Sequence, residues 1–401
     1  MQTRSLTRSV TFPLLLWGCL RILTSVWAAL VSSIRPLTVL EQAVPLWPPS
    51  APMSAWLERV LISPWARWDA HWFARIVSNG YRAEDGTANF QPIYPWLATP
   101  LERIGIHPIF SLLLIGAAAG IGLLILYHFL ARQDLDPGQA QLSSILFLLF
   151  PSAFVIFAPY SEGLFLAFSI LCLILARQQR WWWAGLAGGL AALTRQQGIF
   201  LVAPLAWELW QSRGSSGKPI RQDWKKYLSL GLVPAGLAVW TLYRGLVLGD
   251  VLIDPENFQS LIYSLLISPS THQVVPIQAF VWPWEGIRLA LVKITTQPDL
   301  DIWVNLLAAG IFTFFLIVAW KHMRPSYRIY AIVNTLVSFC FYTGPFHPYM
   351  GLPRHLLLAF PVFIGLAPAL KRPWMRLAAV GICACGNLFT LALYVLEAWV
   401  P

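Results

Sequence analysis

Residues 106–131 read IHPIFSLLLIGAAAGIGLLILYHFLA, and this run contains no acid, lysine or arginine. About 20 apolar residues in a helix cross the ~30 Å hydrocarbon core of a bilayer. The run therefore predicts a transmembrane helix, and similar apolar runs recur along the rest of the chain. The run at 106–131 thus places the protein among helical membrane proteins.

The composition supports the same interpretation. Of 401 residues, 57% are hydrophobic and 11% are charged, whereas soluble domains carry about 25% charged residues. The 21 tryptophans suit a protein with many ring anchors at the membrane surface. The five cysteines all lie in apolar runs, so neither a disulfide framework nor a cysteine metal site is indicated. We expect an all-α polytopic protein with one integral membrane domain, residues 1–401.

Hydropathy predicts about eleven spans, with a possible miscount of one in the region 162–212. The first apolar run follows Arg4 and Arg8 and is interpreted as a retained span rather than a cleaved signal peptide. The candidate spans are 11–33, 106–131, 140–158, 162–177, 181–196, 198–212, 227–247, 302–320, 328–343, 355–370 and 376–398.

The basic residues predict the orientation. The N-terminal tail and five short connections, with their flanks, hold 16 of the 28 lysines and arginines but only three of the 18 acids. Basic loops stay on the cytoplasmic side, so the N-terminus is predicted to be cytoplasmic. The basic cytoplasmic loops account for the net charge of +10, so this charge does not indicate a nucleic-acid partner.

Two long segments, 34–105 and 248–301, then lie outside. Residues 55–63 and 66–79 carry mixed polar and apolar faces with several tryptophans, a pattern typical of helices in the interface plane. Because long loops in compact proteins are usually functional, the first outer loop is the first place to look for chemistry.

That first outer loop contains WDAHWF at 68–73, followed by NGY at 79–81 and FQPIYP at 90–95. Asp69 is an acid among tryptophans, where its environment can tune it as a general base. It can equally cap the helix that follows. A metal pair of Asp69 with His71 is disfavoured, because residues two apart on a helix point to different faces.

Two polar breaks interrupt the apolar runs in the first half of the chain. PYSEG at 159–163 places Glu162 either as a binding residue or as a helix cap. TRQQG at 194–198 contains Arg195, which is costly near a membrane unless it pairs with an acid or an anion. A lipid phosphate suits a guanidinium, and Glu162 or Glu208 would be its partner in a purely structural ion pair.

A fourth polar cluster, HPYMGLPRH at 347–355, opens a late span. Arg354 is a second candidate for binding phosphate, while His347 and His355 are more often structural than catalytic. The predicted topology places all four clusters at the same membrane face. Whether the four clusters meet in the folded protein therefore tests the predicted topology.

These blocks resemble, in the same order, those of a known family. WDAHWF, NGY and FQPIYP look like its first outer loop, and YSEGLF at 160–165 is similar to its Tyr-Thr/Ser-Glu-x-Leu-Phe pattern. TRQQG resembles Thr-Arg-x-x-Gly, and PRHL at 353–356 resembles Pro-Arg-Tyr-x-Leu with His355 in place of tyrosine. The family is PIG-V, the GPI mannosyltransferase 2 proteins and their bacterial relatives, within the GT-C glycosyltransferases. The resemblance runs from about residue 60 to 370.

The resemblance implies a GT-C-like bundle and inverting transfer of a sugar from a polyprenyl-phosphate donor. It implies that Asp69 is the catalytic base and that the two arginines stabilise the leaving phosphate. The substrate-binding set that it implies is Trp68, His71, Tyr94, Glu162, Arg195 and Arg354. Neither a cofactor nor a metal is required in principle, because two guanidinium groups can neutralise the phosphate.

The implied partners are the lipid-linked donor, a lipid or glycan acceptor and the membrane lipids. Mannose is the expected sugar, with galactose, arabinose or another pentose left open, and the family name does not fix the acceptor. The compact loops favour a prokaryotic relative, hence a plasma-membrane protein with its site on the extracytoplasmic side.

Two other classes of function compete. A transporter or flippase should show charged or broken helices at mid-membrane and some repeat symmetry. A non-catalytic subunit of a glycosylation complex should tolerate replacement of Asp69. The enzyme interpretation requires that Asp69, Arg195 and Arg354 converge on one outer-face cavity.

Overall fold

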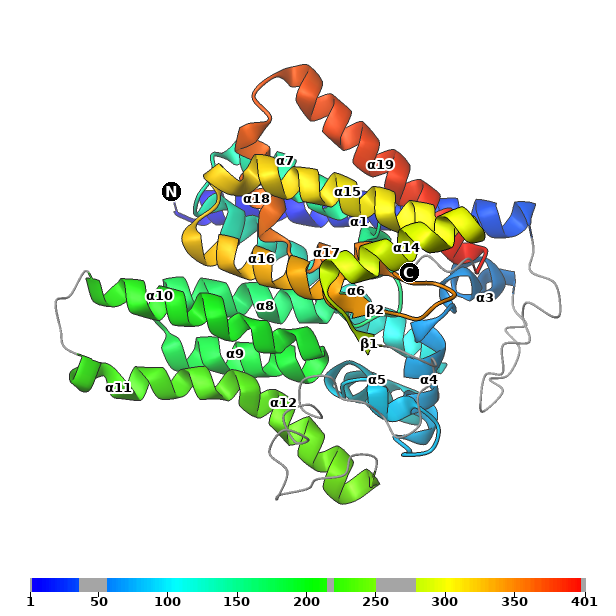
Figure 1. Cartoon of the computed structure of the whole chain (residues 1–401), viewed down its shortest axis with the longest axis horizontal. Helices are drawn as coiled ribbons and strands as arrows, with labels where there is room; N and C mark the ends of the chain where they lie inside the picture. Colours follow the sequence, from blue (N-terminus) through cyan, green and yellow to red (C-terminus); the bar gives the residue numbers. More distant parts are fainter. Residues whose placement is uncertain (1, 36–55, 215–219, 250–278, 398–401) are drawn as a thin grey trace.

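The computed structural model describes residues 2–35, 56–214, 220–249 and 279–397 (Figure 1). These residues are almost entirely helical, so the predicted all-α class is confirmed. The helices are α1 (Gln2–Ile34), α3 (Trp56–Leu61), α4 (Asp69–Asn79), α5 (Ile93–Arg103), α6 (Pro108–Arg132), α7 (Pro137–Leu149), α8 (Glu162–Arg177), α9 (Trp181–Thr194), α10 (Val202–Gly214), α11 (Ile220–Leu228), α12 (Leu232–Tyr243), α14 (Pro283–Thr296), α15 (Leu300–Ala319), α16 (Pro325–Cys340), α17 (Leu352–Leu357), α18 (Pro361–Ala369) and α19 (Pro373–Val395).

Shorter elements join these helices. Two-residue strands, β1 (Ala279–Phe280) and β2 (Phe341–Tyr342), pair antiparallel with Ala279 opposite Tyr342. The helical turns are η1 (Ser63–Trp65), η2 (Thr87–Asn89), η3 (Ala153–Ile156), η4 (Gln196–Leu201), η5 (Ser229–Gly231), η6 (Arg244–Leu248) and η7 (Trp320–His322).

Five helices among the described residues are long and apolar enough to cross a membrane. They are Val10–Ile34, Pro108–Arg132, Trp224–Leu248, Leu300–His322 and Pro373–Val395. The chain is therefore a multi-pass integral membrane protein. The other six predicted spans also contain helix, but α7, α8, α9, α10, α16 and α18 are each shorter than 18 residues. The count of eleven spans stays a prediction.

Prolines shorten two of the predicted spans. The expected span 140–158 ends as an α-helix at Leu149, because Phe150 precedes Pro151 and takes an extended backbone conformation. The chain then continues as the tight turn η3. The expected span 355–370 is likewise divided into α17 and α18, since Pro361 lacks the N–H that a continuous helix would need.

Glycines let α9 and α12 pack with their backbones in contact. A Cβ on Gly236 would lie 2.2 Å from the carbonyl oxygen of Gly189, and one on Gly189 would lie 2.6 Å from the carbonyl oxygen of Leu232. Small residues at such crossings are typical of membrane helices. This packing fixes α9, whose C-terminal end leads into Arg195.

The predicted outer segments are described in part. α3 and α4 form within 55–63 and 66–79, although the second helix begins only at Asp69. Beyond them α5 packs on both α4 and α6 (Figure 1). In the second segment, 248–301, the described part holds β1 and α14. Residues 36–55 and 250–278 of the two predicted loops lie outside the described residues.

Candidate active site

Asp69 is the first residue of α4, and its side chain reaches across the fold instead of capping the helix. The N-cap residue is Trp68, and no side-chain capping hydrogen bond is made there. Trp68 has a φ of 51°, which is uncommon and strained for a bulky residue. The Asp69 carboxylate accepts a 2.5 Å hydrogen bond from the Arg354 guanidinium. The side chain of Asp69 thus binds Arg354 rather than capping the helix, and its role as a site residue stays a prediction.

Arg354 lies in the short helix α17, which the left-handed Gly351 (φ 73°) introduces. The hydroxyl of Ser152 donates to the carbonyl of Pro353 at 2.8 Å and so fixes this turn. The Arg354 guanidinium also lies 5.3 Å from the centre of the Tyr160 ring. An aromatic face and a carboxylate together hold the cation in place.

Glu162, the first residue of α8, joins the two arginines. Its Oε1 accepts from Arg195 at 2.7 Å and lies 3.3 Å from the Nε of Arg354. Its Oε2 is buried without a hydrogen-bond partner among the described residues. The structural partner of Arg195 is therefore Glu162. The other candidate, Glu208, instead accepts a hydrogen bond from Ser326.

The four charged side chains form one continuous chain of contacts, so Asp69, Arg195 and Arg354 lie together as predicted. That they line one cavity at the outer face stays a prediction. Two carboxylates and two guanidinium groups give the cluster a formal charge of zero. The side chain of Asp69 is 25% exposed, whereas those of Arg354 and Glu162 are 11% and 0% exposed. Asp69 is therefore the most accessible member of this cluster.

The pKa of Arg354 reflects its neighbours. Burial acts to lower its pKa, but the carboxylates of Asp69 and Glu162 outweigh burial and raise it above the usual value. Arg354 therefore carries its charge at any physiological pH. A permanent buried cation beside a partly exposed carboxylate is suited to an anionic group such as a phosphate.

His71 stays outside the contacts of this cluster. Burial, with a smaller contribution from the charge of Arg67, lowers the pKa of His71 to about 4. Its Nδ1 is buried and has no hydrogen-bond partner among the described residues. At neutral pH the ring is uncharged. Its predicted role in shaping the substrate pocket stays a prediction.

Tyr94 lies in the packing beside the site. Its hydroxyl donates to the carbonyl of Leu112 at 2.9 Å, and its ring meets Phe73 edge-on at 5.0 Å. These contacts tie α4, α5 and α6 together. Trp68 is partly buried against the main core. The predicted substrate-binding roles of Tyr94 and Trp68 are not tested by these contacts and stay predictions.

Sequence reasoning missed the contribution of α19. The hydroxyl of Tyr394 donates to the carbonyl of Trp65 at 2.8 Å, and Arg67 donates to the carbonyl of Val395 at 3.1 Å. Together they anchor the segment just before Asp69. A single tyrosine in an apolar run carries no signal of this role, and only the fold reveals it.

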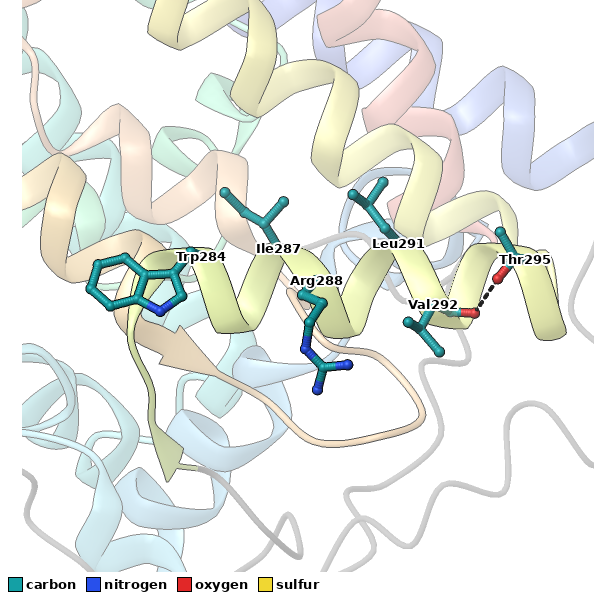
Figure 2. Close-up of a pocket in the computed structure, with 6 residues that line it drawn as sticks. All are labelled: Trp284, Ile287, Arg288, Leu291, Val292 and Thr295. Carbon is teal, nitrogen blue, oxygen red and sulfur yellow. Dashed lines mark hydrogen bonds between the residues drawn. The ribbon is translucent and has the colours of Figure 1, made fainter.

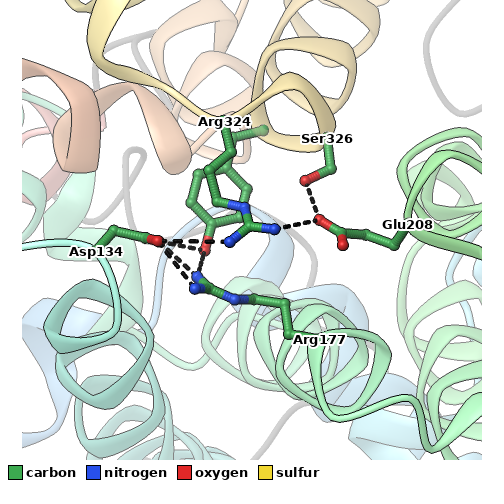
Figure 3. A network of polar contacts seen from close by, with 6 residues as sticks. Asp134, Arg177, Glu208, Arg324 and Ser326 are labelled. Atoms are coloured by element: carbon green, nitrogen blue, oxygen red, sulfur yellow. Dashed lines mark hydrogen bonds and ion pairs between the residues drawn. The ribbon is translucent and has the colours of Figure 1, made fainter. Parts of the chain in front are cut away.

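A second polar network lies at the other end of α8 (Figure 3). Arg177 donates to Asp134 at 2.5 and 2.9 Å, and the Tyr327 hydroxyl donates to the same carboxylate at 3.1 Å. Arg324 lies between Asp134 and Glu208, at 3.7 and 3.5 Å. Since α8 has 16 residues and a helix rises ~1.5 Å per residue, the two clusters are about 24 Å apart.

An open depression of about 470 Å³ lies elsewhere, along one side of α14 (Figure 2). Its lining comes from a single helix and is mainly apolar: Trp284, Ile287, Arg288, Leu291, Val292 and Thr295. Arg288 is paired with Glu285 at 2.6 Å. This surface lacks the carboxylate and buried cation of the cluster at Asp69, so we place the candidate active site at that cluster.

Comparisons with known proteins find a family match in the N-terminal half of the chain. A family profile described as mannosyltransferase (PIG-V) matches residues 14–213. The GPI alpha-1,6-mannosyltransferase 2 of Rattus norvegicus is 32% identical over 193 residues, which are 45% of this chain and 39% of that protein. The match thus spans about two fifths of the length of that relative.

Among solved structures, the chain is similar to ArnT from Cupriavidus metallidurans bound to undecaprenyl phosphate. The identity is 13%, with 95% of this chain and 75% of that chain covered and a TM-score of 0.49. The oligosaccharyltransferase of Archaeoglobus fulgidus has 12% identity, 95% and 56% coverage and a TM-score of 0.44. Through residues 14–213, which include Asp69, Glu162 and Arg195, the chain belongs to the mannosyltransferase (PIG-V) family.

Proposed function

We propose that the protein is an inverting GT-C-type glycosyltransferase. It transfers a sugar, with mannose expected first, from a polyprenyl-phosphate carrier to a hydroxyl group of a lipid or glycan acceptor. The observation that carries the proposal is the pairing of the accessible Asp69 carboxylate with the buried Arg354 guanidinium. Membership of the mannosyltransferase (PIG-V) family supports the reaction class.

The proposed reaction exchanges one bond for another at the anomeric carbon. Asp69 accepts the proton of the acceptor hydroxyl as its oxygen attacks that carbon from the side opposite the phosphate. The bond from the anomeric carbon to the phosphate oxygen breaks, and its electron pair stays on the phosphate. The departing lipid phosphate gains negative charge, which Arg354 and Arg195 stabilise.

Donor binding also changes the ion pair between Asp69 and Arg354. Without donor, Arg354 is shared between Asp69 and Glu162. A donor phosphate competes for that guanidinium and weakens its hold on Asp69. Release of that guanidinium leaves the Asp69 carboxylate free to accept a hydrogen bond from the acceptor hydroxyl. Glu162, with no exposure, keeps both arginines oriented.

The predicted topology disfavours the transporter alternative. Glu162 is the first residue of α8 and Arg177 is the last, so the two charged clusters lie at helix ends. A transporter is expected to bind its cargo near mid-membrane, between broken helices. A non-catalytic subunit should tolerate replacement of Asp69, whereas an enzyme should not. The experiment below distinguishes the two.

The test is sugar transfer by the purified full chain, with polyprenyl-phosphate-mannose as the donor and membrane lipids as acceptors. Asp69→Asn should lower kcat by about 10²-fold or more, because a general base contributes roughly 10²–10⁴-fold. Glu84→Gln is the matched control, since it removes one negative charge from an exposed position in the same loop. Its transfer should equal that of the wild type.

The other outcomes are distinct. Full transfer by Asp69→Asn would remove Asp69 from the role of base while leaving the transferase intact. Absence of transfer by the wild type with mannose, galactose and pentose donors would contradict the enzyme proposal. Transport of the same lipids in vesicles would then identify the protein as a flippase.

A further inference from the structure

Three potential metal ligands that are not part of the Asp69 cluster lie close together. Asp299 and Asp301 flank the start of α15, and His347 lies in the loop after β2. Each offers one ligand atom, and these atoms all lie within 4.8 Å of one another. The Nδ1 of His347 is 2.8 Å from the Oδ2 of Asp301, although the two residues are 46 positions apart in sequence.

Asp301 is the unusual member of this cluster. It is 5% exposed, and its Oδ1 is buried without a hydrogen-bond partner in the described part of the chain. An unsatisfied buried carboxylate oxygen is energetically unfavourable, and buried charges are usually paired or bound to metals. A simple pairing with His347 accounts for Oδ2 but leaves Oδ1 unexplained.

Asp299 provides the exposed ligand of the cluster. It is the N-cap residue of α15 but makes no side-chain capping hydrogen bond, and it is exposed. Its carboxylate can therefore rotate toward Asp301. Ligands bound at about 2.0–2.2 Å to one ion stand closer together than 4.8 Å, and rotation of this exposed side chain supplies the difference.

We propose that Asp299, Asp301 and His347 bind one divalent transition-metal ion, with Zn²⁺ or Mn²⁺ as the matching chemistry. Imidazole nitrogen favours zinc and its neighbours, while carboxylate oxygen favours harder ions such as manganese. Three protein ligands of mixed type leave a coordination position for water. The ion neutralises two acids that otherwise lie side by side.

The ion joins the start of α15 to the loop that presents Arg354. The hydroxyl of Thr343 donates to the carbonyl of His347 and accepts from the amide of Met350 at 2.9 Å. This compact loop leads directly through Gly351 into α17. The metal would therefore act as a positioning element for Arg354, because its three ligands belong to the connected loop and not to the Asp69 cluster.

The test measures metal binding directly and needs no enzyme assay. The full chain is purified in detergent, its affinity tag is removed, and bound metal is stripped with a chelator. Zn²⁺ binding is followed by calorimetry and Mn²⁺ binding by electron paramagnetic resonance. We expect about one ion per chain, and at least tenfold weaker binding by Asp299→Asn and by Asp301→Asn. Glu285→Gln, which removes an exposed acid from neighbouring α14, should bind like the wild type.

Thermal unfolding separates loss of the site from loss of the fold. Because Asp299 is exposed, metal-free Asp299→Asn should unfold at the temperature of the metal-free wild type. Added Zn²⁺ should raise the melting temperature of the wild type and Glu285→Gln but not of Asp299→Asn, since a ligand that binds only the folded state stabilises it. Less than a tenth of an ion per wild-type chain, or equal affinity in all variants, would overturn the proposal.

Discussion

Glu162 and Asp69 are both acids paired with Arg354, but their surroundings give them different roles. Asp69 keeps a quarter of its side-chain surface exposed, so it can meet an incoming hydroxyl group. Glu162 is fully buried and shared between two guanidinium groups. Its role is to hold two like charges near each other, which they would otherwise resist.

Replacing Glu162 by glutamine should therefore separate positioning from catalysis. Glu162→Gln keeps the shape of the side chain but leaves two buried arginines without their shared carboxylate. Removing one partner of a buried ion pair destabilises a protein by about 3–5 kcal/mol. We expect a lower melting temperature and, per folded molecule, a donor KM at least tenfold higher.

Glu208→Gln is the matched control for that change. Glu208 is also buried and also pairs with Ser326 and Arg324, but at the other end of α8. It should lower the melting temperature without altering the donor KM. Glu162→Asp should restore part of the donor affinity. Equal donor KM values in the two glutamine variants would assign Glu162 to stability alone.

At the scale of single residues, the sequence identified the charged members of the candidate site but not all of the contacts between them. Charged residues are rare and costly in an apolar chain, so Asp69, Glu162, Arg195 and Arg354 could be picked out. Their pairing could not be read from spacing, because Asp69 and Arg354 are 285 residues apart. For Arg195 the sequence offered two acids, and the fold decided between them. Tyr394 gave no signal at all.

At the scale of elements, hydropathy predicted where helices occur better than where they end. The apolar run through 140–158 continues past Pro151, but the helix does not. Apolar character measures the preference for lipid, whereas a helix end depends on backbone hydrogen bonds that proline cannot make. Pro361 divides the predicted span 355–370 for the same reason.

The crossing of α9 and α12 provides a test at this scale. Gly236→Ala places a methyl group where only 2.2 Å separates it from the carbonyl oxygen of Gly189. The helices must move apart, and overpacking of this kind costs typically ~1–3 kcal/mol. The melting temperature of the detergent-solubilised protein should fall.

Gly231→Ala is the companion variant. Gly231 lies immediately before α12, and a Cβ added to it would meet no other atom within 4 Å among the described residues. This change should leave the melting temperature unchanged or slightly higher. A fall of equal size in both variants would show that the effect does not come from the contact between Gly236 and Gly189.

At the scale of the whole molecule, α8 separates two polar ends. The candidate active site lies at its beginning, and the network around Asp134 lies at its end (Figure 3). The bias of basic residues predicts that the second end faces the cytoplasm. The sequence thus predicts the orientation of the molecule, while the fold shows which residues share an end.

Labelling of single cysteines checks this orientation. In a variant without the native cysteines, Glu84→Cys lies in the loop after α4 and Gln178→Cys follows α8, and both positions are exposed. A membrane-impermeant maleimide added to intact cells should label Glu84→Cys alone. Gln178→Cys should react only after the cells are permeabilised. The reverse pattern would place the candidate active site in the cytoplasm.

The short length of α8 affects how deep in the membrane the proposed reaction takes place. Its polar ends are about 24 Å apart, whereas the hydrocarbon core of a bilayer is ~30 Å thick. A helix shorter than the local hydrocarbon layer thins the bilayer around it. On the predicted topology, with Arg177 at one surface and the bilayer undeformed, the Glu162 end lies about 6 Å beneath the opposite edge of the core, and thinning of the bilayer reduces that depth. A carrier lipid would then have its headgroup drawn inward, so that its linkage to the sugar is broken below the plane of the neighbouring headgroups.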